Sequence, residues 1–196
     1  MAITDYASLR TAIADFSHRD DLTAYLDTFI ALAEERLAKD LRVPELESSA
    51  TGTLSGITLA LPSDFSVLRR LTIETTTKYQ PINVGADGLR RKYDSANGVP
   101  GYFSIVGSNI EFNRTPDSAY AYALDYYKRP TAITSTNTTS TLLTNRPAVY
   151  LYACLLETAW FTKSDSDISR YQNKYLEILG LANRTRLGGP MQIVTA

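Results

Sequence analysis

Apolar residues recur every three or four positions over the first 42 residues, which is the spacing of amphipathic helices. A polar turn at residues 17–20 divides this region into two helices. On the polar side of the second helix, charges four positions apart predict the ion pairs Glu35–Lys39 and Arg36–Asp40. The apolar stripes consist of Tyr6, Leu9, Ile13 and Phe16 in the first helix and of Leu22, Leu26, Phe29, Ala33 and Leu37 in the second.

The pattern changes between residues 43 and 130, where short stretches alternate apolar and polar side chains. Turn residues separate these stretches, and Gly107-Ser108 between two of them is typical of a hairpin. We therefore expect a small antiparallel sheet or sandwich, with one short helix at residues 87–93. The predicted strands cover residues 57–61, 67–75, 102–106, 109–112 and 120–127.

Helical periodicity returns after a polar, threonine-rich segment, and it predicts two more helices at residues 148–161 and 165–186. The expected fold class is α+β, with a helical bundle built from both ends of the chain and a small antiparallel β domain inserted into it. The predicted parts are a helical bundle domain at residues 1–42 and 142–187, an inserted β domain at 43–130, a linker loop at 131–141 and a C-terminal arm at 188–196.

Residues 148–161 are apolar on almost every side of the predicted helix. The stretch is shorter than the roughly 20 residues that cross a bilayer, so we expect a buried helix and no membrane partner. A helix that is apolar all round needs cover on every side, and we expect copies of the chain to supply part of that cover. The candidate residues for this interface on the helix are Tyr150, Tyr152, Trp160 and Phe161.

The charge balance and the cysteine content limit the possible classes of protein. The chain has 196 residues and a formal net charge of −1, whereas proteins that neutralise nucleic-acid phosphates usually carry a basic excess. A single cysteine cannot form an intramolecular disulfide, and the N-terminus lacks the basic start and apolar run of a signal peptide. We therefore expect a protein made and kept in a cytoplasm.

Residues suited to catalysis are sparse. His18 is the single histidine and lies in a polar turn, where capping or solvation explains it. Cys154 lies among Leu and Tyr, whereas a reactive thiolate needs a partly exposed, electropositive site. A hydrolase built on these two residues stays an alternative, but we expect no enzyme, no catalytic residue, no metal site and no cofactor.

Tyrosine is abundant, with 13 residues in the chain. A tyrosine offers a large contact area with a polar tip and is enriched where proteins meet. About half of these side chains would pack inside the fold, which leaves the others as candidates for interfaces. In the β domain the candidates for contact with a partner are Tyr102, Tyr120 and Tyr122.

A set of short motifs spans nearly the whole chain in a specific order and spacing. On these motifs the chain resembles the head-to-tail adaptor (connector) proteins of tailed bacteriophages, in the group that includes the tail tubular protein A type of short-tailed phages. The motifs are RDDL at 19–22, FIALAE at 29–34, RL at 36–37, DLR at 40–42, LPSDF at 61–65, LRRL at 68–71, YQPI at 79–82, IEF at 110–112 with Pro116 beyond it, LDYYKRP at 124–130, and the stretch from Leu142-Leu143 to Glu157.

The resemblance implies a structural virion protein in the neck between capsid and tail, made in the cytoplasm of the bacterial host. Twelve subunits, monomeric before assembly in some such proteins, would form a ring that joins the portal protein to the tail nozzle or next tail component. DNA would pass through the lumen without specific binding. The β domain would face the tail nozzle, and the C-terminal arm, with Met191, Ile193 and Val194, would reach the portal.

A second hypothesis is a virion accessory module whose β domain binds carbohydrate or a receptor. The rings of Tyr102, Tyr120 and Tyr122 would then form a stacking surface for a sugar. This hypothesis accounts for the tyrosines, but it gives no role to the apolar helix at residues 148–161 or to the flanking helix pairs.

Overall fold

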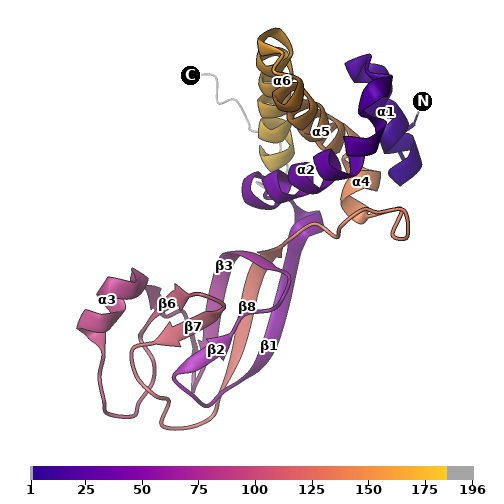
Figure 1. The fold of residues 1–196 in the computed structure, drawn as a ribbon. Helices are drawn as coiled ribbons and strands as arrows, with labels where there is room; N and C mark the ends of the chain where they lie inside the picture. The colour runs from indigo at the N-terminus through magenta and orange to yellow at the C-terminus, as the bar shows by residue number, and fades with distance from the viewer. Residues whose placement is uncertain (1, 185–196) are drawn as a thin grey trace, which may run out of the picture. The chain divides into compact units, whose positions relative to one another are not determined.

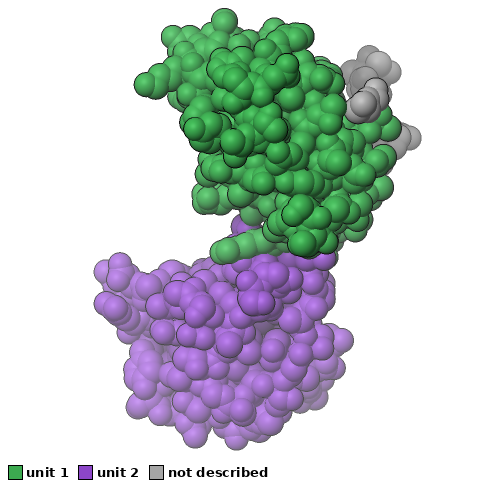
Figure 2. Space-filling view, turned by 45° about the vertical axis from the view of Figure 1, so that its right-hand side comes forward, with its two compact units in different colours: residues 1–47, 129–196 green, residues 48–128 purple. Residues whose placement is uncertain are grey.

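A computed structural model of the chain describes residues 2–184 (Figure 1). It divides the chain into two compact units, one of residues 1–47 and 129–196 and one of residues 48–128, which Figure 2 shows in different colours. The first unit is helical and the second consists mainly of strands, which confirms the predicted α+β class with a β insertion between two helical segments. The C-terminal arm expected at residues 188–196 lies outside the described residues.

The helical unit is arranged around the long helix α5, which packs against α1, α2, α4 and α6 (Figure 1). The segments before and after the β insertion thus share one core, as amphipathic helices must when each has an apolar stripe to cover. The helices of this unit are α1 (Tyr6–Ser17), η1 (Asp20–Tyr25), α2 (Leu26–Asp40), η2 (Pro44–Leu46), α4 (Thr141–Asn145), α5 (Pro147–Thr162) and α6 (Asp165–Arg184).

The expectation that α5 needs a second copy to cover much of its surface is wrong for most of its length. Nine of its 16 residues are buried within the single chain, from Val149 to Ala159. The neighbouring helices surround these positions, so an all-round apolar helix is satisfied inside one subunit. The side chains of its last turn are exposed to solvent, with Trp160 54% exposed and Phe161 50% exposed.

Local hydrogen bonds decide where the N-terminal helices begin. The Asp5 carboxylate accepts a bond from the Ser8 N–H at 2.8 Å, and the Ser8 hydroxyl oxygen accepts one from the Asp5 N–H at 3.0 Å, so α1 starts with a capping box. The second helix differs from the prediction, because residues 20–25 form the 3₁₀ helix η1 and α2 begins at Leu26. The guanidinium of Arg10 on α1 binds the Asp27 carboxylate and the Thr23 carbonyl, which ties α1 to this junction.

One of the two ion pairs predicted on α2 is present. Lys39 and Glu35 form the predicted pair, with their charged atoms 2.7 Å apart. The predicted pair of Arg36 with Asp40 is wrong, because both side chains turn to neighbouring helices. Arg36 donates to the Glu157 carboxylate on α5 at 2.8 Å, and Asp40 accepts a hydrogen bond from the Tyr175 hydroxyl on α6 at 3.0 Å. These contacts connect α2 to both C-terminal helices.

The polar segment that follows the β unit is held against the helical unit. Ile133 is 4% exposed, and its N–H donates to the Glu34 carboxylate on α2 at 2.7 Å. Farther along, the Thr138 carbonyl accepts a bond from the Tyr6 N–H at 2.7 Å, and the Ser140 hydroxyl caps the short helix α4. The sequence did not predict α4, since its five residues are too few to show a helical period.

The β unit contains two four-stranded sheets, with strand orders β1-β8-β3-β4 and β2-β7-β6-β5. Their inward-facing side chains form one core cluster that includes Leu71, Ile110 and Leu124. Gly107, with a φ of 59°, allows the tight turn of the predicted β6–β7 hairpin. The elements are β1 (Glu47–Leu54), β2 (Thr58–Ala60), β3 (Phe65–Glu74), β4 (Lys78–Tyr79), β5 (Ile82–Asn83), α3 (Gly85–Lys92), β6 (Tyr102–Val106), β7 (Asn109–Phe112) and β8 (Tyr120–Lys128).

Two features of the β unit differ from the expected antiparallel arrangement. Strand β5 pairs with β6 in parallel, because α3 lies between them in the chain and brings it back in the same direction. The sequence did not predict β1, whose stretch ESSATGTL lacks apolar alternation. It is an edge strand, and three consecutive residues from Thr51 to Thr53 are exposed. Buried and exposed positions therefore do not alternate along it, and its sequence shows no alternation of apolar and polar residues.

Leu155→Ala tests the packing of α5. Leu155 is 0% exposed, so its truncation should lower the free energy of unfolding by about 2–5 kcal/mol. Leu176→Ala, at a position that is 53% exposed on α6, is the matched control and should change this free energy by about 0.5 kcal/mol or less. Denaturant unfolding followed by the fluorescence of Trp160 measures both, because the single tryptophan lies in the helical unit. Equal effects of the two variants would contradict the central position of α5.

Candidate functional site and interaction surfaces

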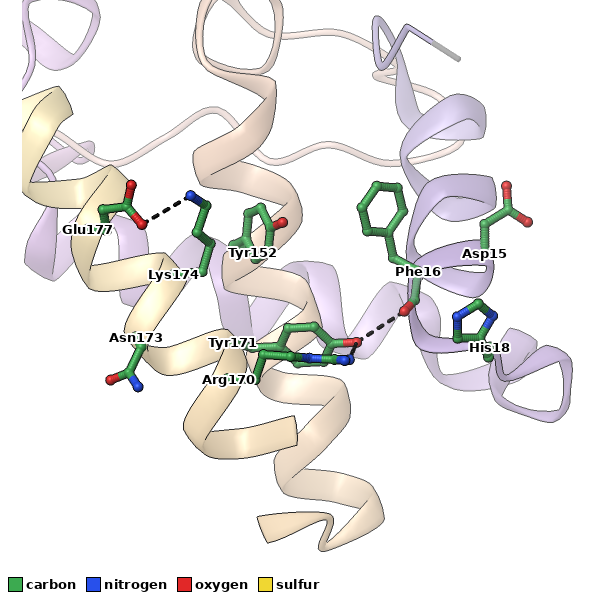
Figure 3. A pocket seen from close by; sticks show the side chains of 9 residues that line it. All are labelled: Asp15, Phe16, His18, Tyr152, Arg170, Tyr171, Asn173, Lys174 and Glu177. Carbon is green, nitrogen blue, oxygen red and sulfur yellow. Dashed lines mark hydrogen bonds and ion pairs between the residues drawn. The ribbon is translucent and has the colours of Figure 1, made fainter. Parts of the chain in front are cut away.

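A crevice of about 740 Å³ opens between α1 and α6, with α5 between them (Figure 3). Tyr152 of α5 lies between the two walls, and this is one of the side chains that the sequence nominated for an interface. We call this cavity the α1–α6 crevice. Its lining residues are Asp15, Phe16, His18, Tyr152, Arg170, Tyr171, Asn173, Lys174 and Glu177.

Hydrogen bonds fix the two walls of the α1–α6 crevice relative to each other. The Tyr171 hydroxyl on α6 donates to the Phe16 carbonyl on α1 at 3.0 Å, and this contact is visible in Figure 3. The Arg170 guanidinium lies 4.7 Å from the centre of the Tyr171 ring and also donates to its hydroxyl at 2.9 Å. The hydrogen bond between Tyr171 and Phe16 therefore sets the distance between α1 and α6 at this end of the crevice.

The predicted apolar stripe of α1 is wrong at Phe16, whose side chain is not buried. Leu9 and Ile13 are fully buried as expected, but Phe16 is 50% exposed and lies on the rim of the crevice. Its backbone carbonyl is bound by Tyr171, whereas its ring lies beside the opening near Tyr152 (Figure 3). An exposed aromatic ring beside an aromatic-lined cavity is typical of a binding surface.

A second apolar surface lies at the end of α5. The rings of Tyr25 and Phe161 are 4.9 Å apart, and Phe161 also packs edge-on against the buried Phe29 at 5.3 Å. Tyr25 is 47% exposed, Phe161 50% and Trp160 54%. We call Tyr25, Trp160 and Phe161 the aromatic patch. The sequence nominated Trp160 and Phe161, but it did not nominate Tyr25, which belongs to the preceding 3₁₀ helix.

The crevice and the aromatic patch face different directions. Tyr152 and Phe161 are nine positions apart on α5, which corresponds to a rotation of about 900°, equivalent to about 180°. Tyr152 therefore faces α1 and α6, while Phe161 faces the opposite side of α5, towards η1 and α2. Trp160, eight positions after Tyr152, is rotated from it by only about 80° but lies about 12 Å farther along the helix axis. The two apolar surfaces of the helical unit are therefore separated along α5 as well as around it.

The placement of Tyr150 on an interface is corrected, because this side chain is 0% exposed. Its hydroxyl donates to the Glu34 carboxylate at 2.5 Å, and the same carboxylate oxygen accepts the Ile133 N–H. Burial raises the pKa of Glu34, and the two hydrogen bonds counteract that effect in part. Burial raises the pKa of Tyr150 far above its usual range, and the negative charge of Glu34 raises it further. The Tyr150 hydroxyl therefore stays protonated and acts as a donor. Tyr150 holds the interior of the subunit together.

The structure also places the residues of the hydrolase hypothesis. Cys154 is 0% exposed, and burial raises the pKa of its thiol well above the ordinary value of 9.0. A buried neutral thiol is a poor nucleophile, so Cys154 acts as a packing residue. His18 is the left-handed C-terminal cap of α1, with a φ of 52°, and its exposed side chain lines the crevice.

The three tyrosines nominated in the β unit do not share one surface. Tyr120 and Tyr122 lie on β8 in one sheet and pack against the core cluster of the β unit. Tyr102 lies on β6 in the other sheet, where the Lys92 ammonium is 5.2 Å from the centre of its ring. Gly52 allows Tyr122 to lie across β1, because a Cβ at this position would be 2.9 Å from the tyrosine hydroxyl. The common stacking platform of the carbohydrate hypothesis therefore has no support in this geometry.

The two exposed aromatic surfaces of the helical unit are suited to contacts with other proteins. The profile of the SU10 adaptor protein family matches residues 4–194. The chain therefore belongs to the SU10 adaptor protein family, a family of bacteriophage adaptors. Its members are structural proteins that interact with other components of the phage neck. None of the curated proteins matches the chain.

The helices within residues 2–184 fall short of a membrane span. None of them combines enough length with enough apolar character to cross a bilayer. The most apolar of these helices, α5, has 16 residues, and most of its side chains are buried in the core of the helical unit.

Glu34→Gln tests the buried carboxylate. A raised pKa means that protonation of Glu34 stabilises the fold fully below the ordinary value of 4.5, and that this contribution is lost as the pH rises through the raised pKa. Glutamine keeps an acceptor oxygen but does not titrate. The free energy of unfolding of the natural protein, relative to Glu34→Gln, should therefore fall between pH 4 and pH 7. Denaturant unfolding of both proteins at each pH measures this difference, and a difference that stays constant or rises would contradict the raised pKa.

Proposed function

We propose that the protein is a head-to-tail adaptor whose subunits form a ring between the portal and the tail nozzle or next tail component. The family match over residues 4–194 is the observation that carries this proposal. A component of the neck binds one partner on the capsid side and another on the tail side. Each subunit therefore needs separate surfaces for separate partners. The exposed aromatic patch and the α1–α6 crevice of the helical unit meet that need.

In this proposal the helical unit contacts the portal and neighbouring subunits, and the β unit faces the tail. The β unit keeps large apolar side chains exposed, among them Ile82, Tyr93 and Val99. Some of these side chains are suited to contact with the next tail component, since tyrosine and aliphatic groups form the centre of protein interfaces. The arm at residues 188–196 would bind the portal through Met191, Ile193 and Val194.

The ring we propose has twelve subunits and encloses the DNA channel. A formal net charge of −1 for each subunit suits a channel through which DNA slides, because the protein has no basic excess to hold phosphates. Many weak contacts repeated around one axis would add up to a stable neck, even if a single subunit binds weakly.

Deletion of residues 188–196 tests the portal contact. The truncated protein should keep its fold, because the buried core residues of both units lie between Leu9 and Ala182, but its affinity for purified portal rings should fall by about tenfold or more. Circular dichroism checks the fold, and sedimentation with portal rings measures the affinity. A variant with a Gly/Ser segment of equal length is the control for chain length. Portal binding equal to that of the full chain would exclude the arm.

A further inference from the structure

We propose that the aromatic patch of one subunit packs into the α1–α6 crevice of a neighbouring copy. This inference rests on the proposed function, because it names the contact that joins subunits in the ring. The patch consists of Tyr25, Trp160 and Phe161, and the crevice is lined by aromatic rings that include Phe16 and Tyr152. The partner of each surface is thus a second copy of the same chain.

Shape and chemistry favour this pairing. A cavity of about 740 Å³ between two helices has room for an aromatic side chain, and Phe16 on its rim is 50% exposed. Rings that meet edge-to-face or offset gain stabilisation beyond the burial of their area. Trp160, the most exposed ring of the patch, is the side chain that we place in the crevice.

Beside the two surfaces, the exposed charges that lack an ion pair in the described part of the chain are of opposite sign. The other charges of the crevice are paired along α6, Arg170 with Asp167 and Lys174 with Glu177. Lys163 follows the aromatic patch directly in sequence and is exposed, and Asp15 lies at the crevice and is exposed. Within residues 2–184, neither side chain takes part in an ion pair. A contact between the patch of one copy and the crevice of the next would bring this cation close to this anion, which fixes the orientation of the contact.

The positions of the surfaces determine the kind of assembly. Phe161 faces the side of α5 opposite Tyr152, and Trp160 lies about 12 Å farther along the helix than Tyr152, so one subunit can bind a neighbour through each surface at the same time. Such a head-to-tail contact is heterologous, and it closes into a ring when the rotation between copies allows it. A symmetric dimer would instead use the same surface on both subunits.

The small size of the aromatic patch implies that a single contact is weak. Three aromatic rings that are each about half exposed offer roughly 300 Å² of surface, whereas a standard interface buries about 800 Å² for each partner. Free subunits should therefore be mainly monomeric when dilute. A ring, or a platform such as the portal that gathers several copies, would supply the additional contacts.

Cysteine crosslinking detects such a weak contact directly. A chain with Asp15→Cys and Lys163→Cys should form a ladder of disulfide-linked dimers, trimers and larger species under mild oxidation. Each single-cysteine variant should form at most a dimer, because the buried Cys154 is inaccessible. The matched control pairs Lys163→Cys with Lys39→Cys, at a position on α2 whose side chain is 69% exposed. A ladder that is no stronger than in this control would overturn the proposal.

A charge exchange tests the orientation of the contact. Asp15→Lys and Lys163→Glu should each weaken association at high protein concentration by roughly threefold to tenfold, and the two changes combined should restore it. Sedimentation velocity measures the association. Lack of restoration in the double variant would overturn the pairing of these two residues. Truncation of 185–196 should leave the ladder intact, and loss of the ladder would overturn the proposal that the patch and the crevice alone form this contact.

Portal binding separates this inference from the proposed function. Each variant is mixed with portal rings at a concentration at which it is monomeric. A crosslinked ladder without portal binding would refute the adaptor role and leave the contact between copies standing. Portal binding without a ladder would leave the adaptor role standing and refute the contact.

Discussion

The burial of α5 is the constraint on which the helical unit depends. Its apolar side chains point in all directions, so the chain has to bring helices from before and after the β insertion to the same axis. The polar contacts across that axis are few and specific, such as Arg36 with Glu157 and Tyr150 with Glu34. Because these groups are partly or fully buried, each would be costly to leave without its partner. Hydrophobic cover thus holds the helices together, and the polar pairs set their register.

The same constraint explains how an insertion of 81 residues is tolerated, from residue 48 to residue 128. The β unit has its own hydrophobic core around Ile73 and Phe112, and this core is formed without side chains of the helical unit. On the helical side, the returning chain is anchored at Ile133, which is buried and bonded to α2. An adaptor that has to meet different partners gains from this division, since one unit can change its surface without disturbing the core of the other.

Sequence periodicity predicted the long helices, most strands and the insertion, because burial on one face leaves a repeating signal. It failed for α4, β1, β4 and β5, which are too short or too exposed to carry that signal. Among the interface candidates, Trp160, Phe161 and Tyr152 line apolar surfaces, whereas Tyr150 is internal. Composition cannot separate these cases, because the same aromatic residue serves both roles. The partner of each polar group, as with Arg36 and Glu157, also depends on long-range packing that local spacing does not contain.

The turn between α5 and α6 has a mechanical consequence. Lys163 adopts a left-handed backbone conformation, with a φ of 55°, and its N–H binds the carbonyls of α5, so the two helices join without a flexible loop. This stiff hairpin carries Trp160 and Phe161 near its bend and Tyr171 farther along its second arm. Because this turn is short and α5 packs against α6 along its length, the two helices are expected to move together. If Trp160 contacts a neighbouring copy, as we propose, a force on this side chain would reach α6 and the wall of the crevice through the same turn.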